Sequence, residues 1–86
     1  MLTHLSVEQK HILEGVQKST RYCPVALAIK DTLANMGHED VDVSVCASCS
    51  RINGVQHFHP EHVRAWIANF DLTGEGQPFT FEFLGT

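Results

Sequence analysis

The sequence of 86 residues has no long apolar run. A membrane-spanning helix needs about 20 consecutive apolar residues, and residues 1–5 do not form the charged and then apolar leader of a signal peptide. We therefore expect a soluble protein in the cytoplasm. The 3 cysteines agree with this expectation, because an odd number does not make a disulfide framework and is typical of a reducing compartment.

Basic residues are also few. Lys and Arg together number 6 against 10 Asp and Glu, which gives a formal net charge of -4. Binding along a phosphate backbone needs a large basic face, so we do not expect a dedicated nucleic-acid-binding protein. The length allows one domain over residues 1–86 with a core of modest size.

The clearest pattern predicts a helix over residues 24–36. Pro24 suits the first position of a helix, where its missing N–H costs nothing. Apolar residues then recur at spacings of four and three from Val25 to Met36, and Gly37 is suited to end the helix. This helix must bury one face.

Two further helices are predicted. Ser6 and Gln9 have the spacing of a capping box, which predicts a short helix that ends at Gly15. Pro60 begins a longer helix, again with proline in the first position. The apolar residues of that helix share one face: Val63, Trp66, Ile67 and Phe70.

Three segments have the pattern of strands. Residues 1–5 form a short edge strand in our interpretation, and residues 41–45 alternate valine with polar residues. Residues 79–84 place three phenylalanines on one side, and we expect that side to face the helix over 24–36. The segment between Asp71 and Pro78 contains two glycines and is expected to be a loop.

Residues 50–58 form an extended segment with two candidate registers. In the first, the chain turns at residues 46–49, the segment runs back along residues 41–45, and Asn53-Gly54 forms a bulge. In the second, the chain turns at Asn53-Gly54, so that the residues on either side of this dipeptide pair with each other. We favour the first register, because the valine strand needs a partner long enough to satisfy its hydrogen bonds.

Together these elements predict an α+β domain, with two longer helices and one short helix packed on a three- or four-stranded antiparallel sheet. A domain this small often extends its core through a second copy, so a homodimer is one arrangement that we expect.

Three segments stand out in combination. They are CPVALA at residues 23–28, Pro60 followed by the apolar stripe that ends in Phe70-Asp71, and PFTFEF at residues 78–83. This combination resembles small uncharacterised proteins of bacteriophages and bacteria. The resemblance covers about half of the chain and assigns no activity. It implies a compact α+β domain of phage origin, where a small early protein often acts by binding a host factor or a signalling molecule.

A C-x-x-C motif, Cys46 to Cys49, is followed by several histidines. Thiolates and imidazoles are the ligands that zinc prefers, so Cys46, Cys49, His57 and His59 are candidate ligands of a structural zinc. In the favoured register Cys49 and His57 lie roughly 20 Å apart, at about 3.3 Å per residue, so the site requires the second register. No helix is predicted after the motif, which argues against thioredoxin-type chemistry.

The region before the helix over 24–36 suggests two other sites. Lys18, Arg21 and Tyr22 are expected to be exposed near the N-terminus of that helix, which favours a small anionic ligand. Cys23 lies at the same place and is a candidate nucleophile if His11 or His62 acts as its base.

We therefore expect a non-enzymatic binding or accessory protein without a cofactor, whose partner is a host protein or a small anionic ligand. A structural-zinc module is the first alternative, and a cysteine-dependent enzyme that uses Cys23 is the second.

Overall fold

The computed structural model describes residues 4–84 as an α+β fold of three helices and five strands, and it confirms the predicted fold class. The strands form two antiparallel sheets, β1-β5 and β2-β3-β4. The elements are β1 (Leu5–Val7), α1 (Gln9–Glu14), α2 (Pro24–Asn35), β2 (Val43–Val45), β3 (Cys49–Ile52), β4 (Val55–Phe58), α3 (Glu61–Thr73) and β5 (Phe79–Phe81). Within this range, no helix is both long and apolar enough to cross a membrane.

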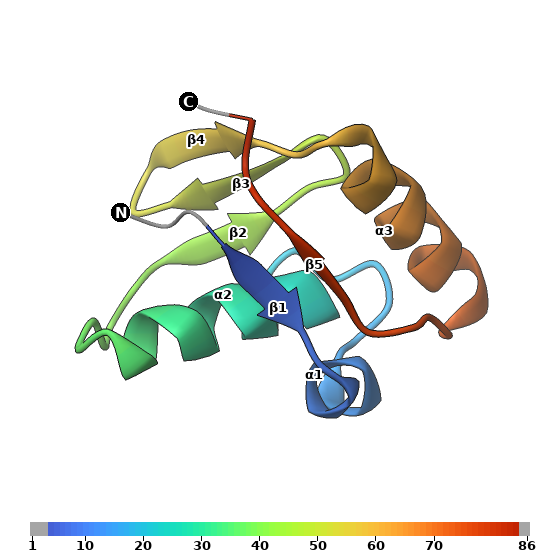
Figure 1. The fold of residues 1–86 in the computed structure, drawn as a ribbon, viewed down its shortest axis with the longest axis horizontal. Coiled ribbons are helices and arrows are strands. Elements are labelled where there is room, and N and C mark those ends of the chain that lie inside the picture. Colours follow the sequence, from blue (N-terminus) through green and yellow to red (C-terminus); the bar gives the residue numbers. More distant parts are fainter. Residues whose placement is uncertain (1–3, 85–86) are drawn as a thin grey trace.

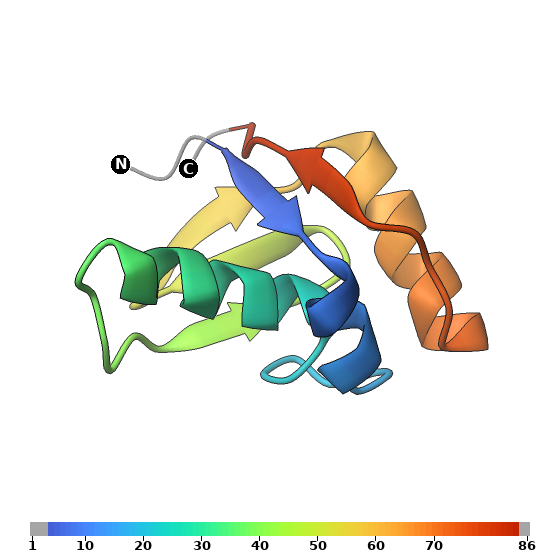
Figure 2. The ribbon, with the colours of Figure 1, turned by 60° about the horizontal axis from the view of Figure 1, so that its bottom comes forward.

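The core lies between α2 and the two sheets. α2 contacts β1 of the smaller sheet and β2 of the larger one (Figures 1 and 2). Most of its predicted apolar face is buried, with Val25 and Ile29 fully enclosed, whereas Met36 at the C-cap is 49% exposed. Side chains from the strands and from α3 complete the same cluster: Leu5, Val7, Val43, Val63 and Phe81. As predicted, the helix ends before Gly37, which has a φ of 90°.

The three-stranded sheet is a meander in which the favoured register is right up to Ile52 and wrong beyond it. β3 pairs with β4 across Asn53-Gly54, with Ile52 opposite Val55. Asn53 and Gly54 both have positive φ, 52° and 84°, which suits the central residues of a two-residue hairpin turn and not a bulge. β3 also pairs with β2, so the expected turn after residue 45 is present as well.

The first strand and helix begin later than predicted. Ser6 lies in β1 opposite Thr80 of β5, so it cannot begin the helix. Glu8 is the N-cap of α1 instead, and its N–H donates to Nδ1 of His11 at 3.0 Å. The strand expected at residues 1–5 shifts to 5–7, and residues 1–3 lie outside the described part of the chain.

α3 also differs from its prediction at both ends. Pro60 is the N-cap and not the first helical residue. The helix runs through Asp71 to Thr73, so the predicted loop after it is shorter, and Gly74 ends it with a φ of 76°.

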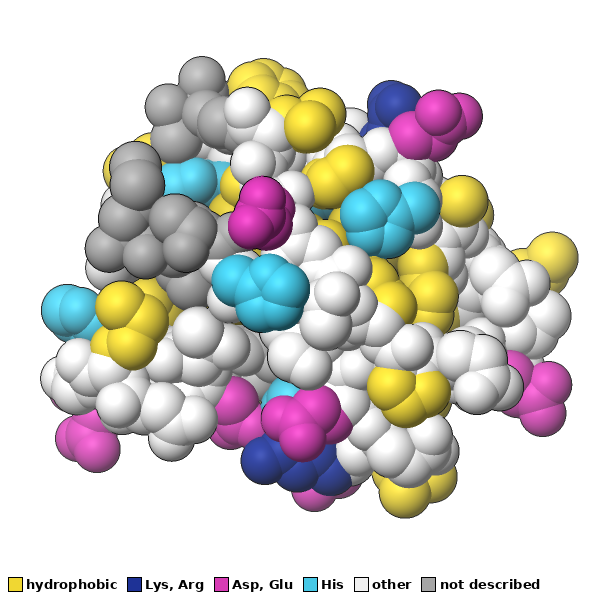
Figure 3. Space-filling view, in the orientation of Figure 1, with side chains coloured by type: hydrophobic (Ala, Val, Ile, Leu, Met, Phe, Trp, Pro, Cys, Tyr) yellow, Lys and Arg dark blue, Asp and Glu magenta, His cyan; other side chains and the backbone are white. Residues whose placement is uncertain are grey.

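β5 ends at Phe81, earlier than the predicted end at residue 84, so Phe83 lies beyond it. Phe81 belongs to the core cluster that includes the buried face of α2, and Phe79 and Phe83 pack against this cluster and on other aromatic rings. The ring of Phe79 lies 4.8 Å from that of Trp66 in α3, between centroids, and the ring of Phe83 lies 5.0 Å from that of His57 in β4. The N–H of Leu84 donates to the carbonyl of Phe58 at 2.9 Å and links the two sheets. The face seen in Figure 3 carries few Lys and Arg side chains, while Asp and Glu are spread around it.

Candidate functional site

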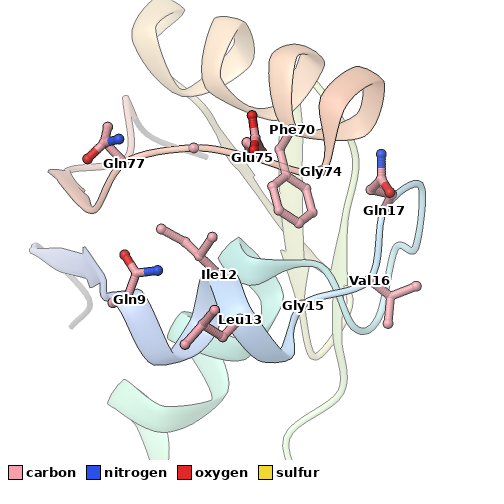
Figure 4. A pocket seen from close by; sticks show the side chains of 11 residues that line it. Gln9, Ile12, Leu13, Gly15, Val16, Gln17, Phe70, Gly74, Glu75 and Gln77 are labelled. Atoms are coloured by element: carbon pink, nitrogen blue, oxygen red, sulfur yellow. The ribbon is translucent and has the colours of Figure 1, made fainter.

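An open groove of about 750 Å³ lies between α1 and residues 74–77. Its floor is apolar, because Ile12 of α1 and Phe70 of α3 point into the space between the two walls (Figure 4). Both floor residues are buried, with exposed fractions of 8% and 2%. Leu13, on the rim, is 76% exposed. The groove thus combines a buried apolar floor with the solvent-exposed side chain of Leu13.

The α1 wall is held by a buried histidine. His11 donates from Nε2 to Oδ2 of Asp31 in α2 at 2.7 Å, and its Nδ1 accepts from the N–H of Glu8. The hydrogen bond from His11, with Lys10 beside it, lowers the pKa of Asp31. A helix of six residues is not stable by propensity alone, so this link to α2 fixes which face of α1 lines the groove.

Gly15 brings the end of α1 against the start of α2. A Cβ at this position would lie 2.5 Å from Cδ of Pro24 and 2.8 Å from the carbonyl oxygen of His11. Its φ of -69° is ordinary, so the requirement for glycine is one of space.

The opposite wall is fixed to α3 by Trp66. The indole Nε1–H donates to the carbonyl of Gln77 at 2.9 Å, and a Cβ at Gly76 would lie 2.6 Å from Cζ2 of the same ring. Asn69 adds a hydrogen bond from Nδ2 to the carbonyl of Glu75 at 3.3 Å. Trp66 is therefore a support for this wall.

Gln17 closes one end of the groove. Its Nε2 donates to the carbonyl of Asp71 at 3.2 Å, and the N–H of Lys18 donates to Oδ1 of the same residue at 2.9 Å. These two bonds join the segment after α1 to the end of α3. Among the described residues that line the groove, Glu75 is the one charged side chain.

The predicted anion-binding residues do not converge. Arg21 donates from Nη1 to Oδ1 of Asp42 at 2.5 Å, and the Tyr22 ring lies under Nζ of Lys30 at 4.9 Å. Lys18 lines a separate pocket of about 260 Å³. Neither Arg21 nor Tyr22 lines that pocket.

The predicted zinc ligands are also not brought together. Cys46 is exposed at the β2–β3 turn, and Cys49 is buried at the start of β3. His57 is on the other face of the sheet from Cys49, because it pairs with Ser50, the next residue along. Within residues 4–84 no three His, Cys, Asp or Glu residues are grouped to hold a metal.

His59 is a buried structural residue that the sequence did not reveal. The sequence indicated it only as a candidate zinc ligand, but its side chain is 2% exposed and is used within the fold. Nδ1 donates to the carbonyl of Ala47 at 3.1 Å, and Nε2 accepts from Oγ of the fully buried Ser50 at 2.6 Å. Burial lowers the pKa of His59, so the neutral ring is favoured. A serine–histidine pair is a catalytic arrangement when a substrate reaches it, but here both side chains are enclosed.

Cys23 is placed as a helix cap. It is 4% exposed, and its Sγ accepts from the N–H of Ala26 at 3.4 Å. Burial is the main cause that raises the pKa of this thiol, which disfavours the thiolate that a nucleophile needs. The two candidate bases have other partners, since His11 bonds Asp31 and His62 Nε2 lies 3.2 Å from the carbonyl of Thr80.

Comparison with known proteins suggests no function, so a proposal must be based on the geometry of the site. The chain matches no protein-family model, no curated protein and no solved structure. The groove between α1 and residues 74–77 is lined by α1, α3 and the segments that follow them, and it leaves the apolar side chain of Leu13 exposed.

Proposed function

We propose that this protein is a non-enzymatic accessory protein that binds an apolar segment of a partner protein in the groove between α1 and residues 74–77. The observation that carries the proposal is the exposure of Leu13, 76%, directly beside the buried floor formed by Ile12 and Phe70. Covering apolar surface is favourable by about 25 cal/mol per Å². The apolar surface that a partner side chain could cover there belongs to Leu13 and Val16, which are 76% and 52% exposed and line the groove beside the buried floor.

The polar residues of the groove favour an extended peptide segment. Gln9, Gln17 and Gln77 line it, and amide side chains can both donate to and accept from a peptide backbone. Glu75 adds a carboxylate, and among the residues that the structure describes no Lys or Arg lines the groove to pair with it. The segment that fits best has apolar residues with Lys or Arg nearby.

A location in the cytoplasm is part of this proposal. It is supported by the free state of Cys23, Cys46 and Cys49, which suits a reducing compartment. We do not include a small anionic ligand in the proposal, because Arg21 pairs with Asp42 and the Tyr22 ring contacts Lys30.

Peptide selection tests the proposal. A random-peptide display library is selected on the immobilised full chain, and the affinity of the enriched peptides is measured by calorimetry. We expect peptides that combine apolar residues with Lys or Arg. Leu13→Asn should weaken their binding about tenfold, which corresponds to about 1.4 kcal/mol.

Leu72→Asn is the matched control. Leu72 is 82% exposed on α3 but does not line the groove, so the same substitution should leave the affinity unchanged. Thermal melts of both variants check that the fold is intact. Enrichment of no peptide, or an equal loss of affinity in the two variants, would contradict the proposal. Self-association that Leu13→Asn abolishes would identify a second copy of this chain as the occupant.

A further inference from the structure

Cys46 and Cys49 face each other across a turn of two residues. In the β2–β3 pairing Val45 lies opposite Ser50, so the next opposite pair is Cys46 and Cys49. The N–H of Cys46 donates to the carbonyl of Cys49 at 2.8 Å, so a backbone hydrogen bond joins the two residues across the turn. The motif therefore closes a β-hairpin, whereas thioredoxin-type motifs begin a helix.

The separation within such a pair suits a disulfide. Directly opposite residues of an antiparallel hydrogen-bonded pair have Cα atoms about 5.5 Å apart, and their side chains project from the same face. Disulfides join cysteines whose Cα atoms are roughly 4.4–6.8 Å apart. The backbone register thus places the two cysteines side by side on one face, and the bond requires their Cβ atoms to approach by about 1 Å.

The turn between the two cysteines is held by His59. The His59 ring donates to the carbonyl of Ala47, and its backbone N–H donates to the carbonyl of Ser48 at 3.0 Å. Both residues of the turn are therefore tied to the end of β4. This restraint keeps Cys46 and Cys49 opposite each other in the native state.

The two thiols differ in their access to solvent. Cys46 is exposed, so a reagent in solution can reach it. Cys49 is 6% exposed, and its Sγ accepts a hydrogen bond from Nε2 of Gln56 at 3.2 Å. Cys23 is also buried, but it caps α2 and belongs to another part of the fold. One exposed thiol with one enclosed neighbour is the arrangement of an attacking and a resolving cysteine.

We propose that Cys46 and Cys49 are a redox-modification site that is oxidised to an intramolecular disulfide by a low-molecular-weight disulfide such as oxidised glutathione. The Cys46 thiolate attacks one sulfur of the oxidant, the S–S bond of the oxidant breaks, and one thiol leaves. The Cys49 thiolate then attacks the Cys46 sulfur, and the second thiol leaves. The protein loses two electrons and two protons, and the oxidant is reduced to two thiols that carry them.

Intact-mass analysis and peptide mapping test this proposal on the full, folded chain. The wild type and Cys23→Ser are treated with oxidised glutathione beside Cys46→Ser and Cys49→Ser. We expect the first two to form the Cys46–Cys49 disulfide and to accumulate at least about tenfold less glutathione adduct than Cys49→Ser, which has no resolving thiol. Cys46→Ser should stay unmodified while folded and react once unfolded in urea.

Three results would overturn the proposal. The first is a wild type that keeps its glutathione adduct to the same extent as Cys49→Ser. The second is a disulfide that maps to Cys23. The third is reaction of folded Cys46→Ser at the rate of the wild type. Because Cys46 is exposed, its replacement by serine leaves the packing unchanged, so this arm is informative even if Cys49→Ser is destabilised.

Discussion

His59 is the residue on which the conformation of the β2–β3 turn depends. Its ring and its backbone N–H together hold the carbonyls of Ala47 and Ser48, and its Nε2 holds the hydroxyl of Ser50. Because the ring is enclosed, protonation would place a charge in the interior. The Ser50 hydroxyl can turn to accept from a protonated ring, so the cost of protonation comes mainly from burial of the charge.

The lowered pKa of His59 makes the stability of the fold depend on pH. In the unfolded chain this histidine takes up a proton near its ordinary pKa of 6.5, whereas in the folded chain it does so only at lower pH. The unfolded state therefore binds more protons below pH 6.5, and the free energy of unfolding falls as the pH decreases from 6.5. Above that pH the contribution of His59 is fully present.

Urea unfolding of the wild type and of His59→Asn between pH 7.5 and about 5 measures this contribution. Asparagine can replace both hydrogen bonds in part but does not titrate. We expect the wild type to lose more stability than the variant over this range. His57→Asn, a change to a half-buried histidine on β4, should keep the pH dependence of the wild type. Identical slopes for the wild type and His59→Asn would show that this ring does not cause the effect.

At the scale of elements, α1 owes its position to its contacts with α2. The helix has six residues, and its two firm links to α2 are the His11–Asp31 hydrogen bond and the close approach of Gly15 to Pro24. The rim of the groove therefore depends on this short element being kept in place.

Gly15→Ala should move or loosen α1. The new Cβ would lie 2.5 Å from Cδ of Pro24, and the proline ring cannot rotate away, so we expect a loss of about 2 kcal/mol in the free energy of unfolding. Gly37→Ala is the comparison, because no atom lies within 4 Å of its Cβ and the cost there comes from the positive φ alone, about 1 kcal/mol. Urea unfolding measures both. A loss for Gly15→Ala no larger than that for Gly37→Ala would contradict the role of this contact.

The elements that the sequence predicts well are those with long periodic patterns. The helices α2 and α3 follow from apolar residues at helical spacing, and most of each predicted face is buried; Met36 is exposed and Trp66 half-buried. Short elements were less well predicted because two local patterns compete. Ser6 with Gln9 and Glu8 with His11 both have the spacing of a helix cap, and the pairing of β1 with β5 decides between them by taking Ser6 into a strand.

At the scale of the whole molecule, the groove is made by parts that are far apart in the sequence. Residues 9–17 form one wall and contribute Ile12 to the floor, whereas Phe70 completes the floor and residues 74–77 form the opposite wall. No local motif marks these segments, and the chemically conspicuous residues, such as Cys46, lie elsewhere. The sites chosen from the sequence were motifs, whereas this groove is a consequence of packing, so spacing alone could not predict it.

The charge of the groove leads to a last prediction, which depends on the proposed function. Glu75 is exposed on the wall, and the whole chain is acidic with a net charge of -4, so a cationic peptide should bind more weakly as salt is added. Glu75→Gln should lower the affinity of the selected peptides by about twofold to fivefold, the usual range for one exposed ion pair, and should reduce the salt dependence. Glu82→Gln removes one exposed carboxylate outside the groove and should change neither quantity. Calorimetric titrations at low and high salt measure both effects, and an equal response of the two variants would mean that net charge, and not Glu75, attracts the peptide.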